Sequence, residues 1–175
     1  MNVVKITQLF SDGLKEEIDF WLDHESPFYE DDTWIKESDS LYTLSNAYVN
    51  TLHKVLTDIS REIFQVHNLL PSVATLKWIE GNNDEKNHID SGPSEYTIIY
   101  NYFSEDKIFL THEDEKLEIG QQESVAYEGY SNFHTLNNFE GTALLFYFSF
   151  AKPDNAYFHF GQYNDDGTIS FPSGK

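Results

Sequence analysis

Hydrophobic and polar positions follow one period in the first part of the chain and another in the rest. Before residue 73, apolar side chains recur at steps of three or four, which is the spacing of one helix face. One such stripe runs from Leu14 to Leu22 and is preceded by Ser11 or Asp12 as a helix N-cap. A longer stripe runs from Leu41 to Val66. We therefore predict two amphipathic helices, preceded by a short strand over residues 3–10.

From residue 73 the period changes to two, which is typical of strands with one buried face. The segments that show it are 73–80, 95–103, 107–112, 124–127 and 142–150. Polar stretches at 27–40 and 163–175 are expected to be loops. Helices followed by a run of strands favour an α+β fold, namely a double-stranded β-helix of the jelly-roll or cupin kind backed by N-terminal helices.

The length of 175 residues fits one domain, and no linker rich in Pro, Gly or Ser divides the chain. We expect a single domain over 1–175, with a mainly helical support layer at 1–72, a barrel core at 73–162 and a tail at 163–175. The 14 Phe and 11 Tyr residues supply apolar side chains for the core and suit β structure more than a helical bundle.

The charge is strongly unbalanced, with 11 basic against 30 acidic residues and a formal net charge of −19. Such a surface repels a phosphate backbone, so we expect no nucleic-acid partner. The acidic residues either form a solvated surface with no partner or bind a cationic substrate or a basic protein. No long apolar span and no signal peptide is present, so we expect no membrane contact and a cytoplasmic location. The sequence has no Cys, so any metal must use His, Asp or Glu.

Candidate chemistry is concentrated in His88-Ile89-Asp90 and in the later His134. On an extended segment, residues i and i+2 point to the same side, so His88 and Asp90 can approach one ion together. Two imidazoles and one carboxylate leave open positions on Fe(II) for a co-substrate and for oxygen, which suits an oxygenase. The alternative is a solvated polar loop without a metal. The segment is not a calcium loop, because it lacks the ligand spacing that such a loop requires. His112 is the substitute ligand that the sequence offers.

Further segments surround these residues in a recognisable order. Trp78-Ile79-Glu80-Gly81 precedes the H-x-D tripeptide, Ile98-Ile99-Tyr100-Asn101 follows it, and the run Ile119–Tyr127 precedes Phe133-His134. Over almost its whole length the chain resembles the iron(II)/2-oxoglutarate-dependent dioxygenases, in particular their prolyl-hydroxylase-like branch. The resemblance implies Fe(II) held by His88, Asp90 and His134 as the catalytic set, 2-oxoglutarate as co-substrate, and hydroxylation of a protein side chain or a small molecule.

One departure from that branch concerns the co-substrate. The branch carries Arg or Lys shortly after the distal histidine to hold the distal carboxylate of 2-oxoglutarate, but here Ala143 stands nearest that place and Glu140–Leu145 contains no cation. Tyr100 or Lys107 could supply the contact instead, the co-substrate could differ, or the chain could be inactive. Two alternatives to the dioxygenase therefore stand: a non-catalytic barrel module used for binding or assembly, and a cupin-type metal enzyme with another reaction.

Overall fold

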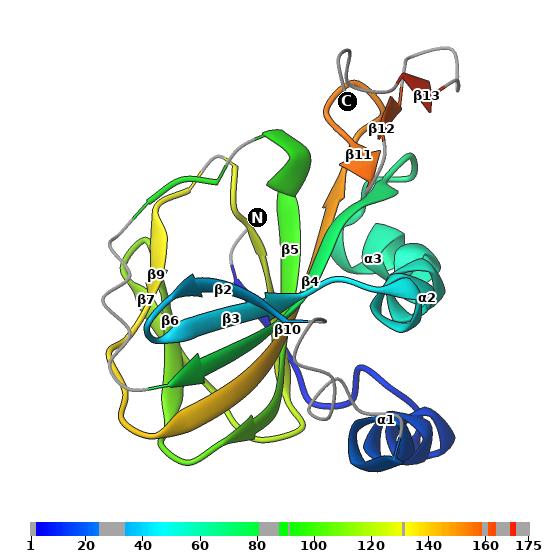
Figure 1. Ribbon diagram of the computed structural model, residues 1–175. Helices are drawn as coiled ribbons and strands as arrows, with labels where there is room; N and C mark the ends of the chain where they lie inside the picture. The colour runs from blue at the N-terminus through cyan, green and yellow to red at the C-terminus, as the bar shows by residue number, and fades with distance from the viewer. Residues whose placement is uncertain are drawn as a thin grey trace.

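The computed structural model describes residues 3–24, 34–80, 88–90, 92–130, 132–158, 161–163 and 169–170. Within these residues, two β-sheets face each other, and helices cover the outer side of the larger sheet (Figure 1). The strands of the larger sheet are β1 (Val4–Ile6), β2 (Ile35–Ser38), β3 (Leu41–Leu44), β4 (Leu70–Glu80), β5 (Tyr96–Ser104), β8 (Ser124–Glu128) and β10 (Thr142–Ala151). They lie in the order β1-β8-β5-β10-β4-β3-β2, and all neighbours are antiparallel.

The smaller sheet consists of β6 (Ile108–His112), β7 (Glu115–Ile119) and β9 (His134–Leu136), in the order β7-β6-β9. A further small sheet of β11 (Tyr157–Phe158), β12 (Gly161–Tyr163) and β13 (Ile169–Ser170) lies at the end of the large sheet where β10 ends (Figure 1). Part of the tail that the sequence predicted as loop is therefore strand. The predicted loop at 27–40 falls partly outside the described residues, and its described end forms β2.

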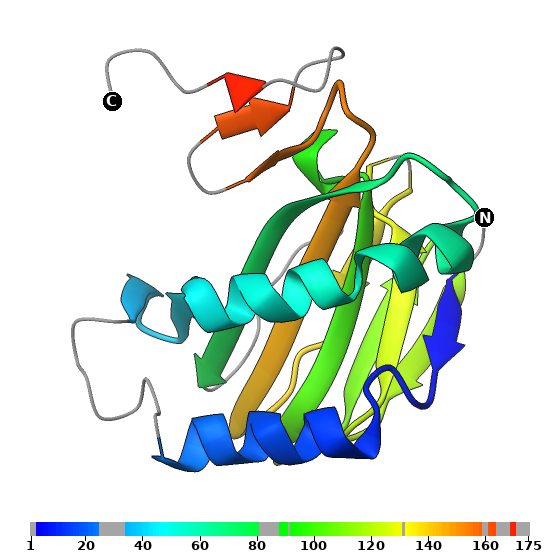
Figure 2. The same ribbon diagram turned by 90° about the vertical axis from the view of Figure 1, so that its right-hand side faces the viewer.

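The helices are α1 (Asp12–His24), α2 (Ala47–Val55) and α3 (Thr57–Phe64), with a 3-10 turn at Gly92–Ser94. They run across the outer face of the large sheet, α1 near one end of the strands and α2 with α3 across the middle (Figure 2). Among the described residues, no helix combines the length and apolar composition needed to cross a membrane.

The single long helix predicted over 41–66 is wrong, because its first residues form β3 and the remainder is interrupted. Residues 41–44 pair with β4, so tertiary hydrogen bonding overrides their helix-compatible spacing. The Asn46 side chain then accepts a hydrogen bond from the Val49 backbone N–H at 3.0 Å and caps α2. Gln65, in the left-handed conformation with φ 56°, ends α3.

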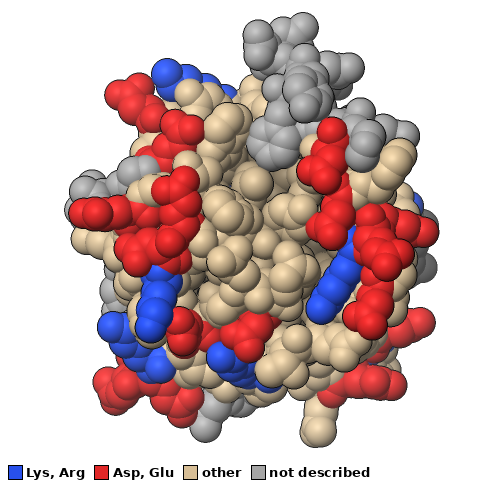
Figure 3. Space-filling model, turned by 90° about the horizontal axis from the view of Figure 1, so that it is seen from below, with Lys and Arg blue, Asp and Glu red and all other residues tan. Residues whose placement is uncertain are grey.

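Acidic side chains dominate the charged surface. On the face shown in Figure 3 they surround an uncharged centre, with only a few basic side chains between them. The ion pairs of Lys and Arg among the described residues are at least partly exposed, such as Lys5 Nζ to Glu123 Oε1 at 3.1 Å. Pairs of this kind add little stability, so most of the negative charge is left for solvent and salt to screen.

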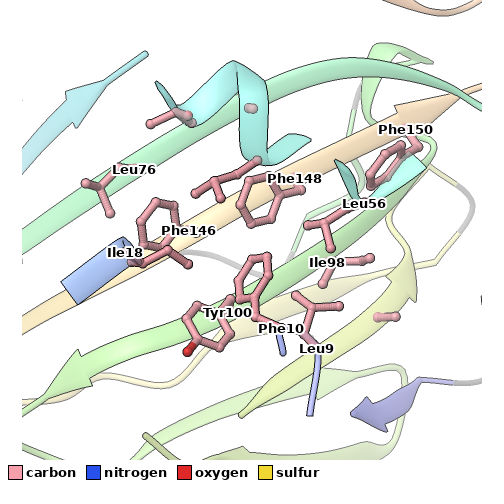
Figure 4. Close-up of a cluster of buried hydrophobic side chains, with 14 of the residues drawn as sticks. Leu9, Phe10, Ile18, Leu56, Leu76, Ile98, Tyr100, Phe146, Phe148 and Phe150 are labelled. Atoms are coloured by element: carbon pink, nitrogen blue, oxygen red, sulfur yellow. The ribbon is translucent and has the colours of Figure 1, made fainter. Parts of the chain in front are cut away.

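Two apolar cores lie on the two faces of the large sheet, since successive strand residues point to opposite sides. The outer core, under the helices, contains Phe146, Phe148 and Phe150 of β10 together with side chains such as Ile18 of α1 (Figure 4). The inner core, between the two sheets, contains the alternate residues of β10, including Leu145. Burying each Phe is worth about 1.5–3 kcal/mol, so the outer core fixes the helices while the inner core shapes the barrel.

Candidate metal centre and cavity

Three side chains with metal-binding atoms converge where β9 begins. One ligand atom from each of His88, Asp90 and His134 lies within 4.8 Å of the others. Asp90 stands between the imidazoles, with Oδ1 3.2 Å from His88 Nε2 and Oδ2 3.2 Å from His134 Nε2. Ligand atoms about 2.1 Å from one ion and at right angles to each other lie about 3 Å apart, so this spacing suits a single first-row cation.

The main chain, rather than side-chain packing, brings these residues together. His88 N–H donates to the His134 carbonyl at 3.0 Å, and His134 N–H donates back to the His88 carbonyl at 2.9 Å. Asp90 N–H donates to the Gly129 carbonyl at 2.8 Å. The tripeptide is thus hydrogen-bonded to the barrel, while the polar stretch ahead of it, 81–87, lies outside the described residues.

A backbone carbonyl orients the His134 ring. Its Nδ1 lies 3.0 Å from the carbonyl oxygen of Asn132, so in the tautomer with the proton on Nδ1 this bond leaves the Nε2 lone pair directed toward Asp90 and a metal. The Tyr127 ring lies 4.6 Å away, centroid to centroid, and His134 itself is buried. The imidazole therefore has little freedom to turn away.

Gly129 provides the space that the Asp90 carboxylate occupies. A Cβ at this position would overlap Asp90 Oδ2 and would lie 3.2 Å from the Ser94 carbonyl oxygen. Because the same residue accepts the Asp90 backbone hydrogen bond, it fixes both the main chain and the carboxylate. Its role depends on having no side chain.

A cavity of about 170 Å³ opens beside the three residues, between the two sheets. Its wall on the large sheet carries the hydroxyls of Thr75, Thr97 and Ser149, of which Thr97 Oγ1 and Ser149 Oγ are 3.0 Å apart. Apolar side chains on the smaller sheet, Leu110 and Leu136, close the opposite wall. A small polar molecule could therefore lie against the hydroxyls while it reaches the metal-binding atoms.

Lys77 adds a positive charge to the cavity lining, and it is the only Lys or Arg there among the described residues. It stands on β4 opposite Leu145 of the neighbouring strand β10. Its Nζ lies 3.8 Å from the centroid of the Tyr147 ring, another lining residue, in a cation–π contact. The cation that the sequence lacks around Ala143 is thus present one strand away.

The two residues that the sequence suggested as anchors lie elsewhere. Tyr100 is buried in the outer core on the opposite face of β5, with its ring edge-on to Phe10 and its hydroxyl donating to Gln122 Oε1 at 2.5 Å. Burial raises the pKa of this hydroxyl to about 12, so it stays a neutral donor. Lys107 lines a separate hollow at the β5–β6 turn. The proposed co-substrate contact by Tyr100 does not agree with this geometry.

His112, the suggested substitute ligand, is a neighbour of the site rather than part of it. It pairs with His134 across β6 and β9, and its buried ring lies 5.9 Å from that of Tyr127. Among the described residues its Nε2 has no hydrogen-bond partner, and it is not in the group whose ligand atoms converge. The structure therefore favours His88, Asp90 and His134 as the ligand set.

Comparisons with known proteins bear on the fold alone. No family model and no curated protein matches the sequence. Among solved structures, an oxidoreductase of the 2OG-Fe(II) oxygenase family from Burkholderia pseudomallei superposes with a TM-score of 0.67 at 8% identity, covering 89% of this chain and 86% of that chain. The non-heme alpha ketoglutarate dependent epimerase SnoN from nogalamycin biosynthesis gives a TM-score of 0.60 at 9% identity, covering 87% and 79%.

A prolyl hydroxylase from Trichoplax adhaerens, solved with a hypoxia inducible factor peptide, gives a TM-score of 0.56 at 6% identity and covers 88% of this chain and 85% of that chain. At such identities the likeness shows the fold. It confirms the predicted α+β double-stranded β-helix, and the resemblance to 2-oxoglutarate oxygenases holds at the level of architecture.

Sequence reasoning missed Lys77, Tyr147 and Gly129. The alternation in 73–80 does place Lys77 on the face of the strand shared by Val73 and Thr75, so a signal existed. Which face lines a cavity depends on the pairing of β4 with β10, and that pairing joins segments far apart in the chain. Gly129 shows no local signal, because its neighbour Asp90 is distant in sequence.

Proposed function

We propose that this protein is an Fe(II)- and 2-oxoglutarate-dependent dioxygenase that hydroxylates a protein side chain or a small molecule. The observation that carries the proposal is the convergence of His88, Asp90 and His134 at a cavity within this fold. Two nitrogen ligands and one oxygen ligand on one side of an ion leave its other side for a bidentate co-substrate and oxygen. The fold of the structural neighbours supports the same reaction class.

His88, Asp90 and His134 would hold the metal through the atoms that already face one another. With Fe(II) bound, the chemistry on offer is hydroxylation coupled to decarboxylation, in which R–H, 2-oxoglutarate and O₂ give R–OH, succinate and CO₂. The Asn132 carbonyl keeps the His134 proton on Nδ1, and Gly129 keeps the Asp90 carboxylate in place.

Lys77 would bind the distal carboxylate of 2-oxoglutarate. Its ammonium group is placed by the Tyr147 ring, and the Thr97 and Ser149 hydroxyls line the cavity nearby. A charge-assisted bond of this kind contributes about 1.5–3 kcal/mol, enough to offset the absence of a cation near Ala143. Leu110 and Leu136 would keep bulk water from the bound acid.

The test is anaerobic titration with Fe(II) and then 2-oxoglutarate, followed by visible absorption for the charge-transfer band of the iron chelate. Oxygen should then yield succinate. His134→Ala should abolish the band and succinate formation. His67→Ala, at an exposed position after α3, should leave both unchanged. A band that survives in His134→Ala would reject the assigned ligands.

A non-catalytic barrel module is the second candidate, favoured by the apolar environment of Ala143, where the resembling branch carries its cation. The same titration separates the two functions. Iron binding without the charge-transfer band, and without succinate in the presence of oxygen, would support the module and overturn the dioxygenase.

A further inference from the structure

Three large apolar side chains are exposed around the metal-binding residues. Ile89, Tyr130 and Phe133 are 43%, 49% and 49% exposed, whereas most apolar residues of the barrel are buried. Because His88 and His134 form an isolated antiparallel β-bridge, the next residues, Ile89 and Phe133, follow it on the face turned away from the cavity. Tyr130 follows Gly129, which binds Asp90. We call these three residues the mouth patch.

An acidic turn adjoins the mouth patch. Glu113, Asp114 and Glu115 lie at the turn between β6 and β7 and are exposed. Glu113 is fixed to Phe133 by two bonds: its N–H donates to the Phe133 carbonyl at 2.8 Å, and its Oε1 accepts from the Phe133 N–H at 3.2 Å. These bonds hold the acidic turn next to the segment that carries the exposed Phe133 side chain.

One basic residue adjoins the acidic turn: Lys116 follows Glu115, and its Nζ lies 4.6 Å from the centroid of the Phe109 ring. Neither 88–106 nor 117–151 contains a Lys or Arg, although both contain Asp or Glu. The three carboxylates of the acidic turn thus outnumber the one ammonium group next to them, and in a chain of net charge −19 this excess favours a positively charged partner.

We propose that the mouth patch and the acidic turn dock a basic polypeptide segment, whose apolar side chains cover Ile89, Tyr130 and Phe133 and whose Lys or Arg side chains face Glu113, Asp114 and Glu115. None of the three patch residues lines the cavity, so the surface that they form with the acidic turn lies outside it. An occupant that covers both presents several apolar and basic side chains at once, as a polypeptide does. The inference goes beyond the proposed function, because this surface lies outside the cavity where hydroxylation would take place.

The experiment measures binding and needs no turnover. The probe is a fluorescein-labelled peptide with Lys-Leu-Ser-Gly repeated three times, followed by fluorescence anisotropy at physiological salt, beside a counterpart with Glu in place of Lys. We expect the Lys peptide to bind and the Glu peptide not to bind. Neutralising the turn with Glu113→Gln, Asp114→Asn and Glu115→Gln should weaken binding about five-fold, and Phe133→Ser about ten-fold.

A matched variant removes the same number of charges from α1 through Glu16→Gln, Glu17→Gln and Asp23→Asn, and should leave the affinity within about two-fold. Equal weakening by both sets of substitutions would show that only net charge matters and would overturn the proposal. An unchanged affinity in Phe133→Ser would do the same, as would displacement of the peptide by an equimolar amount of spermidine, which has charge but no apolar side chains.

Failure of this inference can be told apart from failure of the dioxygenase. His134→Ala should lose iron binding yet keep the Lys peptide, because its substitution leaves the exposed patch in place. Peptide binding without iron binding in the wild-type protein would reject the dioxygenase and keep the docking surface. Succinate formation without peptide binding would keep the dioxygenase and reject the docking surface.

Discussion

At the scale of single residues, the site depends on the absence of a side chain at Gly129 and on the positive charge of Lys77. Gly129 has no side chain where a methyl group would meet the Asp90 carboxylate, and Lys77 places the only described basic group of the cavity lining beside Tyr147. Neither residue belongs to the tripeptide that first indicates a metal. Both can be tested by substitutions that leave the core untouched.

Gly129→Ala should lower the affinity for Fe(II) by about 10- to 100-fold, the range found when residues that support metal ligands are changed. The added methyl group would push the Asp90 carboxylate away from the imidazoles. Equilibrium titration with Fe(II) under argon measures the effect. Gly13→Ala on α1, where a Cβ meets nothing within 4 Å, is the control, and equal affinities for the two variants would contradict the steric role.

Lys77→Met should raise the KM for 2-oxoglutarate by about 10- to 100-fold, because one charge-assisted bond worth about 1.5–3 kcal/mol is lost. The aliphatic part of the side chain is largely retained, so the fold should persist. Steady-state succinate assays at varied 2-oxoglutarate give the result. Lys107→Met, in the hollow at the β5–β6 turn, should leave KM unchanged; the reverse pattern would assign the anchor to Lys107.

At this scale the sequence predicted His88, Asp90 and His134 because residue type carries metal-binding chemistry, and the i, i+2 spacing places His88 and Asp90 on one side of an extended segment. It did not predict Lys77, the proposed contact for the distal carboxylate of 2-oxoglutarate. Tyr100 occupies the expected strand but faces the outer core, since one step along a strand exchanges the two faces. Only the register of β5 and β4 against β10 decides which side chains meet in the cavity.

At the scale of elements, α2 is joined to the large sheet by a buried histidine. The His53 Nε2 lies 2.7 Å from the carbonyl oxygen of Ser149 on β10, and its ring packs edge-on to Phe150 at 4.8 Å between centroids. Burial lowers the pKa of His53 from 6.5 to about 4. The neutral ring therefore fits this helix–sheet contact and the protonated ring does not.

This contact should make stability depend on pH. Because the folded-state pKa of His53 lies below the unfolded value, its neutral form contributes fully above pH 6.5, and stability is lost as pH falls toward 4. The loss at pH 5 should be about 2 kcal/mol relative to pH 7. Urea unfolding at both pH values measures it. His53→Gln should reduce the difference in unfolding free energy between pH 7 and pH 5 by that amount, while the exposed His67→Gln should not. The same pH dependence of the unfolding free energy in both variants would contradict the assignment.

The helices themselves were only partly predictable. The apolar spacing from Leu41 onward fits a helix and a short strand equally well over its first four residues, and pairing with β4 selects the strand. The cap at Asn46 could have indicated the later start, since Asn is a preferred N-cap residue. The order of helices and strands was thus readable, whereas their boundaries depended on contacts far away in the chain.

At the scale of the whole molecule, the change of period from helix-like to strand-like was enough to predict a barrel backed by helices. The sequence did not predict how the strands divide between the two sheets, because β1, β2 and β3 come from the N-terminal segment and join the large sheet across long sequence distances. Closure of a barrel is a property of the whole set of pairings, not of any one segment.

The net charge of −19 should make the folded protein more stable in moderate salt. Repulsion among acidic groups opposes the compact state, and about 0.3 M NaCl screens it over distances beyond a few ångströms. We expect the Tm to rise by about 2–4 °C between 20 mM and 300 mM NaCl, which corresponds to about 1 kcal/mol for a chain of this size. Differential scanning calorimetry measures it, with sucrose of equal osmolality as the control. A fall in Tm would show that attractive ion pairs dominate instead.

The reciprocal backbone bonds between His88 and His134 separate the shape of this end of the barrel from the identity of its ligands. Every residue except proline supplies the same backbone N–H and C=O, so exchanging an imidazole for another such side chain keeps the hydrogen bonds between the two segments. Evolution, or an engineer, can therefore alter which ion is held and which reaction is run without rebuilding the scaffold that holds it.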